Sequence, residues 1–310
     1  MAKAKQDIYK VITERVIDGL KTKGLNWFKP WNAGTGDLQS ILPINNTTGR
    51  AYKGFNVFWL SCEMEANGYQ HNEWLTYKQA EKIGGQVRKG SKGTQVVYWN
   101  ICFVDENGKF YRNAEAVKKA GLSLGDVKKI FSPRLHTVFN IGQCDNVEPR
   151  RKPQAPVEPS EFNPLEMAES VYRDLYPKDK RPALDHGGDR AYYSPVMHKV
   201  QMPKPDTFKG ADYYYHTLFH ELIHSTGHKD ILNRLSDVAA FGSKDYSKEE
   251  LVAEIGAQFL SGIMGVQCNQ VNSQAYINGW ITKLSNNPKW VIGASTHAQK
   301  AVEFILGEAQ

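Results

Sequence analysis

The stretch YYYHTLFHELIHSTGHKD, residues 213–230, decides how the C-terminal half of this chain is expected to fold. It places His220 and His224 four residues apart, with Glu221 directly after the first histidine. Residues four apart in an α-helix lie on one face, about 6 Å apart along the axis, so both imidazoles point to one place. The neighbouring positions are apolar, and the pattern predicts an amphipathic helix over about 211–227.

This spacing is the H-E-x-x-H pattern, in which two neutral imidazoles bind Zn²⁺ and the carboxylate is the general base. We therefore predict His220 and His224 as metal ligands and Glu221 as the catalytic base. Mn²⁺ or Co²⁺ would suit the same ligands, and the sequence does not distinguish these ions. The alternative is a helix whose histidines are incidental.

A catalytic zinc site needs a third protein ligand and one open position. Four side chains compete for this role: His228, Asp230, Glu250 and Glu254. Gly227 is expected to end the helix before His228. Ser247 and Glu250 have the spacing of a capping box at the start of the next helix, which gives Glu250 a structural reason to be there. Glu254 lies in the interior of that helix, where a carboxylate is costly unless it is paired or binds metal.

We predict Glu254 as the third ligand and keep the other three as alternatives. Such a site hydrolyses a carbonyl compound, because the metal activates a water and the base takes its proton. The segment 196–202 reads as a strand that could pair with an extended peptide, so a protein or peptide is the predicted substrate. The spacing singles out no oxyanion stabiliser among the candidates Tyr192, Tyr193, Tyr213, Tyr214, Tyr215 and His297.

The first half of the chain has a different character. Residues 1–150 contain 22 Lys and Arg against 14 Asp and Glu, a net charge of +8, whereas residues 151–310 carry −2. Aromatic rings alternate there with cations and amides, as in NWFKPWN (26–32) and GRAYKGFN (49–56). Rings stack on unpaired bases and cations follow phosphates, so the pattern predicts binding of single-stranded nucleic acid.

The predicted nucleic-acid contacts are Trp27, Lys29, Trp31, Arg50, Tyr52, Lys53, Trp74, Arg88, Lys89 and Lys92. Each tryptophan has an ordinary alternative role, which is packing in a core. Trp59 is expected in the core because its neighbours are apolar, whereas the surroundings of Trp27, Trp31 and Trp74 are polar and rich in turns.

The fold class that follows is α+β with two domains. Five prolines in residues 146–164 indicate a semi-extended linker, because proline fixes φ and removes a hydrogen-bond donor. We predict a nucleic-acid-binding domain over 1–145, a linker over 146–163 and a metallopeptidase-like domain over 164–310. The predicted helices cover about 7–22, 54–66, 76–83, 164–176, 211–227, 248 onward, 271–285 and 288–305, and the strands about 94–105, 109–111, 138–144 and 191–203.

Two further features of the sequence indicate in which cellular compartment the protein is expected. No apolar run approaches the roughly 20 residues that a membrane span needs, and the first twenty residues lack the apolar core of a secretory signal. The four cysteines are widely scattered, which is typical of buried, reduced thiols. We therefore expect a cytoplasmic protein.

Several stretches resemble the ArdC-type antirestriction proteins. In the first half these are WFKPWN (27–32), INNTTGRAYKGFNVFWL (44–60) and residues 72–99, and in the second FHELIHSTGHKDILNRL (219–235) and EELVAEIGAQFL (249–260). The resemblance implies an N-terminal domain that binds single-stranded DNA and a zincin-like metallopeptidase domain. It places His220, Glu221, His224 and Glu254 at the family's metal and base positions, whereas the position of Asp230 is more often basic.

The resemblance also implies a role in conjugation, the protection of incoming DNA from host restriction. An alternative is a protein that only coats single-stranded DNA and whose metal site is structural or vestigial.

Overall fold

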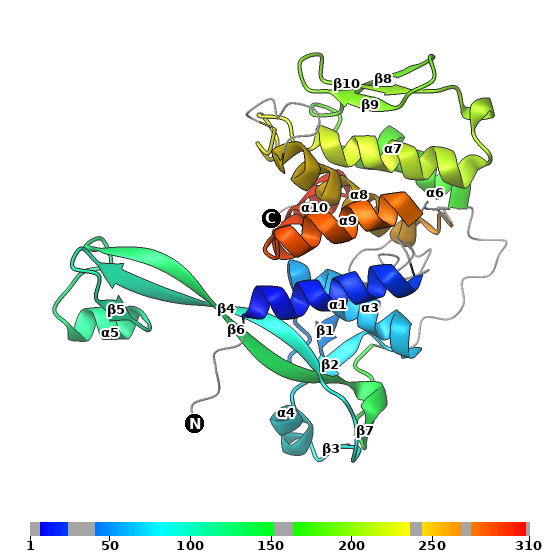
Figure 1. The fold of residues 1–310 in the computed structure, drawn as a ribbon. Coiled ribbons are helices and arrows are strands. Elements are labelled where there is room, and N and C mark those ends of the chain that lie inside the picture. The colour runs from blue at the N-terminus through cyan, green and yellow to red at the C-terminus, as the bar shows by residue number, and fades with distance from the viewer. Residues whose placement is uncertain (1–6, 24–40, 152–163, 236–243, 268–273, 308–310) are drawn as a thin grey trace.

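The computed structural model describes residues 7–23, 41–151, 164–235, 244–267 and 274–307. The fold is α+β, as predicted, with helices and sheets in both halves of the chain (Figure 1). The predicted DNA contacts Trp27, Lys29 and Trp31 lie outside the described residues, as does the segment 152–163 of the predicted linker.

The first half contains α1 (Ile8–Lys23), β1 (Ile44–Asn45), α3 (Phe55–Asn67), β2 (Glu73–Leu75), α4 (Tyr77–Lys82), β3 (Gln86–Val87), β4 (Thr94–Asp105), β5 (Phe110–Tyr111), α5 (Ala114–Lys119), β6 (Val127–Asn140) and β7 (Cys144–Asp145). Five of these strands form one sheet in the order β1-β2-β6-β4-β5, and β3 pairs with β7. The pair β1–β2 is parallel, and the other pairs are antiparallel.

The two long strands β4 and β6 pair from Thr94↔Val138 to Asp105↔Val127. The predicted strand at 138–144 was therefore too short and began too late. Lysines, Pro133 and Arg134 interrupt the apolar pattern of β6, so its N-terminal part does not stand out in the sequence. Pro133 lies opposite Trp99, two positions along the ladder from the pair Val97↔Leu135. At Val97 the backbone N–H and C=O point away from β6 and bond to the Asn56 side chain. Positions two apart have the same orientation, so Pro133 is tolerated because no ladder hydrogen bond needs its missing N–H.

The second half contains α6 (Pro164–Ser170), a π-helical turn (Val171–Leu175), β8 (Ala183–His186), β9 (Tyr192–Ser194), β10 (Lys199–Met202), α7 (Ala211–Ser225), α8 (Lys244–Met264), α9 (Gln274–Asn286) and α10 (Trp290–Ile305). The sheet order is β8-β10-β9, and this sheet lies along α7 (Figure 1). The central strand β10 is paired on both sides, so it has no free edge for a peptide. The expectation that segment 196–202 pairs with substrate is thus wrong, and the outer strands of this sheet are β8 and β9.

The two halves share one hydrophobic core. A continuous cluster of buried side chains includes residues of α1 and α3 together with residues of α7, α8, α9 and α10. The rings of Phe58 in α3 and Phe259 in α8 lie 6.3 Å apart, and Thr13 Oγ1 donates to the Pro288 carbonyl at 2.8 Å. The predicted domains are therefore packed against each other and not joined by a linker alone.

The beginning of the predicted linker is anchored to the first half. The backbone N–H groups of Arg150 and Arg151 donate to the carboxylate of buried Glu73, at 2.9 and 2.7 Å. Asn46 donates to the same carboxylate at 2.7 Å and to the Glu148 carbonyl at 3.0 Å. Residues 146–151 therefore belong structurally to the N-terminal half.

Helices α7 and α8 approach closely at Gly256. A Cβ at this position would lie 2.7–3.0 Å from three side-chain carbons of Ile223. Glycine therefore sets how closely α8 approaches α7, the helix with the paired histidines.

Among the described residues, none of the helices combines the length and the hydropathy required to cross a membrane.

The close contact of Gly256 with Ile223 predicts opposite effects for two glycine substitutions in helices. Gly256→Ala should lower the free energy of unfolding by about 1–3 kcal/mol, because the added methyl overpacks the α7–α8 contact. Gly279→Ala, in α9 with open space around it, should raise it by about 0.5–1 kcal/mol, because alanine is the better helix former. Urea unfolding monitored by circular dichroism measures both. Equal effects of the two substitutions would contradict the close contact.

Candidate functional site

The two histidines of α7 converge as their spacing predicts. The Nε2 atoms of His220 and His224 lie 3.2 Å apart, and the rings meet edge to face with centroids 4.8 Å apart. Donor atoms about 2.0–2.1 Å from a tetrahedral zinc ion are separated by about 3.3 Å. The nitrogen separation therefore fits two ligands of one small cation.

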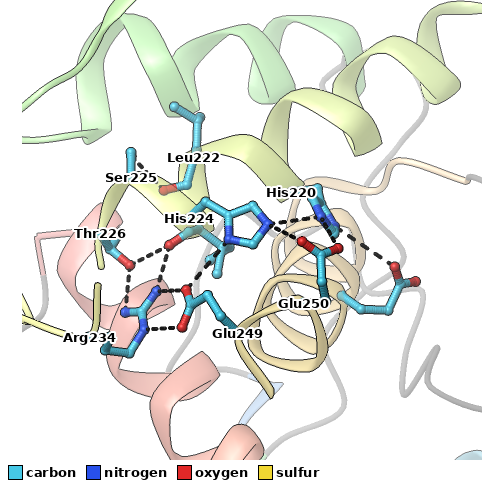
Figure 2. A network of polar contacts seen from close by, with 10 residues as sticks. His220, Leu222, His224, Ser225, Thr226, Arg234, Glu249 and Glu250 are labelled. Atoms are coloured by element: carbon cyan, nitrogen blue, oxygen red, sulfur yellow. Dashed lines mark hydrogen bonds and ion pairs between the residues drawn. The ribbon is translucent and has the colours of Figure 1, made fainter. Parts of the chain in front are cut away.

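A carboxylate from α8 completes this cluster. The oxygens of Glu250 lie 3.5 Å from His220 Nε2 and 3.3 Å from His224 Nε2. Among the described residues, His220, His224 and Glu250 form the group whose ligand atoms all lie within 4.8 Å of one another (Figure 2). Two imidazole nitrogens and one carboxylate oxygen are a donor set that suits Zn²⁺ and other first-row divalent ions.

The predicted third ligand, Glu254, lies one helical turn further along α8. It is buried, and its carboxylate lies 3.8 Å from Nδ1 of His220, the nitrogen that faces away from the shared point. The capping-box argument against Glu250 is wrong, because α8 begins at Lys244 and Ser247 is already inside the helix. Asp230 is exposed and lies 3.7 Å from the Nδ1 atom of His228, whose ring packs against His198.

A second glutamate of α8 contacts the other side of His224. Glu249 lies 3.5 Å from His224 Nδ1 and accepts hydrogen bonds from the Arg234 guanidinium at 2.8 and 3.1 Å (Figure 2). Arg234 also donates to the Thr226 hydroxyl at 2.9 Å and to the Ile223 carbonyl at 2.8 Å. The pair therefore joins His224 to the end of α7. A hydrogen bond from Nδ1–H to a carboxylate fixes the histidine tautomer and leaves Nε2 free to bind metal.

The electrostatics of the site favour positive charge. Burial disfavours the imidazolium form of His224, but its hydrogen bonds to Glu249 and Glu250 outweigh burial and raise its pKa to about 10. Burial also acts against the Glu250 carboxylate, but the two histidines hold its pKa well below the usual range. The pKa of Glu254 is raised, above all by burial. Without a metal the site therefore retains protons, which a bound cation would replace.

Glu221, the predicted base, is buried on α7, and its charge helps to raise the pKa of His224. Three of the tyrosines considered as oxyanion stabilisers have hydroxyls engaged elsewhere. Tyr193 bonds to His198 at 2.8 Å, Tyr214 bonds to His186 at 2.8 Å, and Tyr215 donates to Glu169 at 2.9 Å. These contacts favour structural roles for all three.

The predicted nucleic-acid contacts differ in how accessible they are in the structure. Trp74 is fully buried and its indole N–H donates to Asn72 Oδ1 at 2.8 Å, so it cannot stack on a base in this structure and the prediction for it is wrong. Its neighbours in the sequence are polar, but its strand β2 lies between β1 and β6. Tyr52 is half-buried, and burial raises its pKa.

The remaining predicted contacts are exposed and come from two segments: Arg50 and Lys53 before α3, and Arg88, Lys89 and Lys92 between β3 and β4. Arg88 has intramolecular partners. It pairs with Asp145 and donates to the Cys144 carbonyl, both at 3.1 Å, and also donates to the Gly142 carbonyl. Its guanidinium therefore ties the β3–β4 loop to β7.

Both halves of the chain match known protein families. Residues 6–132 match the N-terminal domain of the anti-restriction factor ArdC, and residues 176–297 match a zincin-like metallopeptidase model. Two Escherichia coli proteins named DNA primase TraC are 36% and 35% identical over 99% and 100% of the chain. The chain spans only 20% and 28% of the length of these two proteins.

Other relatives are similar over at least nine-tenths of their length. An uncharacterized protein of Sinorhizobium fredii, y4eC, is 30% identical over 96% of this chain and 91% of its own length. The metal-free crystal structure of the antirestriction protein ArdC from plasmid R388 has a TM-score of 0.69 and 30% identity, and covers 98% of this chain and 100% of that one. The Mn(II)-bound structure of the same protein has a TM-score of 0.69 and 31% identity, and covers 98% of each chain. The chain therefore belongs to the ArdC antirestriction family and carries a zincin-like domain in its C-terminal half.

Proposed function

We propose that this protein is a metal-dependent peptidase that binds single-stranded DNA and protects DNA entering a cell by conjugation. The observation that carries the enzymatic part is the convergence of two imidazole nitrogens and a carboxylate on one point, 3.2–3.5 Å apart. The family and the basic first half support the antirestriction and DNA-binding parts. This function places the protein in the cytoplasm, where incoming DNA meets host nucleases.

We propose His220 and His224 as ligands of the metal, with a carboxylate of α8 as the third. The distances favour Glu250 over Glu254, because Glu250 reaches both Nε2 atoms. The ion would be Zn²⁺, Mn²⁺ or Co²⁺, and the Mn(II)-bound ArdC structure supports a divalent metal. A divalent ion bound there would lower the pKa of a water and polarise a carbonyl group.

The remaining chemistry belongs to side chains of this chain. Glu221 would accept the proton of the attacking water on a carboxylate oxygen and then deliver it to the leaving amine. Glu249, held by Arg234, would keep the proton of His224 on Nδ1. An extended peptide would lie along an outer strand of the β8-β10-β9 sheet, beside α7.

A single substitution separates proteolysis from simple DNA coating. Glu221→Gln removes the general base, and its side chain is nearly isosteric, so peptide hydrolysis should fall by at least about 10²-fold. Metal affinity, measured by calorimetric titration, should stay within about threefold of wild type, since Glu221 is not a ligand in this proposal. Full protection of transferred DNA by this variant would show that the protein protects without cleavage.

Paired glutamine substitutions in α8 test the third ligand. Glu250→Gln should weaken Zn²⁺ binding by about 10²-fold or more, because an amide is a poorer ligand than a carboxylate. Glu254→Gln should weaken it by about tenfold or less, as expected for a group behind a ligand. Calorimetry on the two full-length variants decides the assignment. The opposite order would return the role to Glu254.

The buried pair behind His224 gives a further prediction. Glu249→Gln should weaken metal binding by about 10- to 100-fold, because a neutral amide accepts from His224 less strongly than the carboxylate that orients it. The same change should lower the free energy of unfolding by about 3–5 kcal/mol, because the buried Arg234 guanidinium loses the negative charge that compensates it.

The exposed pair of Lys199 and Asp185 serves as the control. Asp185→Asn should cost less than about 1 kcal/mol and leave metal affinity unchanged. If Glu249→Gln behaved like Asp185→Asn in both assays, Glu249 would have no positioning role.

A further inference from the structure

The longest exposed feature of the first half is the ribbon formed by β4 and β6. It extends from the rest of the molecule and carries β5 and α5 at its far end (Figure 1). The strand β2 pairs with β6 at Phe139 and Asn140, and β5 pairs with β4 at Phe103 and Val104. Among the described residues, no third strand pairs with the ribbon between these two places. Two-stranded ribbons of this kind are marginal by themselves. In the middle of this one, Tyr98, Trp99 and Ile101 are exposed.

The register sorts the side chains of the ribbon onto two faces. Opposite residues of an antiparallel pair share a face, and side chains alternate along each strand. Tyr98 pairs with Arg134, and the neighbouring positions of the same face pair Asn100 with Ser132 and Val96 with His136. We call this face, the alternate positions from Val96 to Val104 and from Lys128 to His136, the Tyr98 face. Its middle holds Tyr98, Asn100, Ser132, Arg134 and His136.

The Tyr98 face presents an aromatic ring beside a cation. The Tyr98 side chain is 63% exposed, and its ring meets the His136 ring edge-on, with centroids 5.7 Å apart. Arg134 is exposed directly opposite Tyr98. Cross-strand neighbours have Cβ atoms about 4.5–5.5 Å apart, so one nucleotide can contact both side chains.

The charges of this face are of one sign. Its ten described residues, taken at alternate positions from Val96 to Val104 and from Lys128 to His136, include Arg134 and Lys128 and no Asp or Glu. The opposite face carries Asp105, which accepts hydrogen bonds from the adjacent turn and from Tyr111. A polyanion is therefore attracted along the Tyr98 face and meets no carboxylate of the strands there.

We infer that the Tyr98 face binds single-stranded DNA, with one base stacked on Tyr98 and the adjacent phosphate on Arg134. A lone exposed tyrosine needs no explanation. Here the ring, the cation and the missing negative charge coincide on a ribbon that projects from the molecule. The inference rests on the proposed DNA-binding function and locates it on a surface none of the predicted contacts includes. An accessible ring favours an unpaired strand over a duplex, whose bases are already stacked.

The test is fluorescence anisotropy with the full-length protein and a labelled oligo(dT) of about 20 nucleotides, longer than one binding site. Tyr98→Ala should weaken binding by about tenfold to a hundredfold, whereas Tyr98→Phe, which keeps the ring, should bind as wild type. Arg134→Ala should weaken binding and reduce the salt dependence, log K against log salt, by about 0.7, and Arg134→Lys should restore it. Tyr77→Ala, at another exposed tyrosine, which lies in α4, is the control and should change nothing.

The outcomes separate this inference from the proposed function. No binding of oligo(dT) by the wild type would reject DNA binding and the Tyr98 face together. Wild-type affinity of both Tyr98→Ala and Arg134→Ala would reject the Tyr98 face alone. Equal loss of duplex and single-strand binding in Tyr98→Ala would reject stacking on an unpaired base. Circular dichroism of each variant checks that the fold is retained. Tyr98→Leu keeps the apolar bulk without the aromatic ring, so it should lose DNA binding as Tyr98→Ala does.

Discussion

The C-terminal half depends on one electrostatic constraint: the charges of several carboxylates beside two histidines must be compensated. Glu249, Glu250 and Glu254 project from α8 toward the helix that carries His220 and His224, and Arg234 is bound to the first of the three. Burying several carboxylates is costly unless positive charge is near. A divalent cation bound between the histidines, as proposed above, would provide that charge, and the raised pKa of His224 reflects the same demand when no metal is bound.

The packing of the helices gives this arrangement its geometry. The contact of Ile223 with Gly256 brings α8 against α7, and a larger residue at 256 would move the carboxylates away from the imidazoles. The shared core then links this pair to the N-terminal half through α3, whose Phe58 contacts Phe259 of α8. The two activities proposed for this protein are therefore supported by one continuous set of buried side chains, and a change in the core affects both.

The sequence predicts some of these features well and others poorly, for physical reasons. The H-E-x-x-H spacing predicted the convergence of His220 and His224 because helix geometry is local. The third carboxylate depends on which turn of α8 faces α7, and the sequence places Glu250 and Glu254 one turn apart on the same face. Glu250 was set aside because the sequence placed the start of α8 at Ser247, whereas the helix begins at Lys244. Trp74 was misjudged from its polar neighbours, because its burial comes from strands distant in sequence.

The most direct measurement is a crystal structure of the zinc-loaded protein, with the ion identified by anomalous scattering. We predict one ion bound by Nε2 of His220 and His224 at about 2.0–2.1 Å, by one carboxylate of α8, and by a water at the fourth position. A protein that takes up no ion at these histidines would contradict it. So would an ion whose coordination is completed by protein atoms alone, because no water would then be available for hydrolysis.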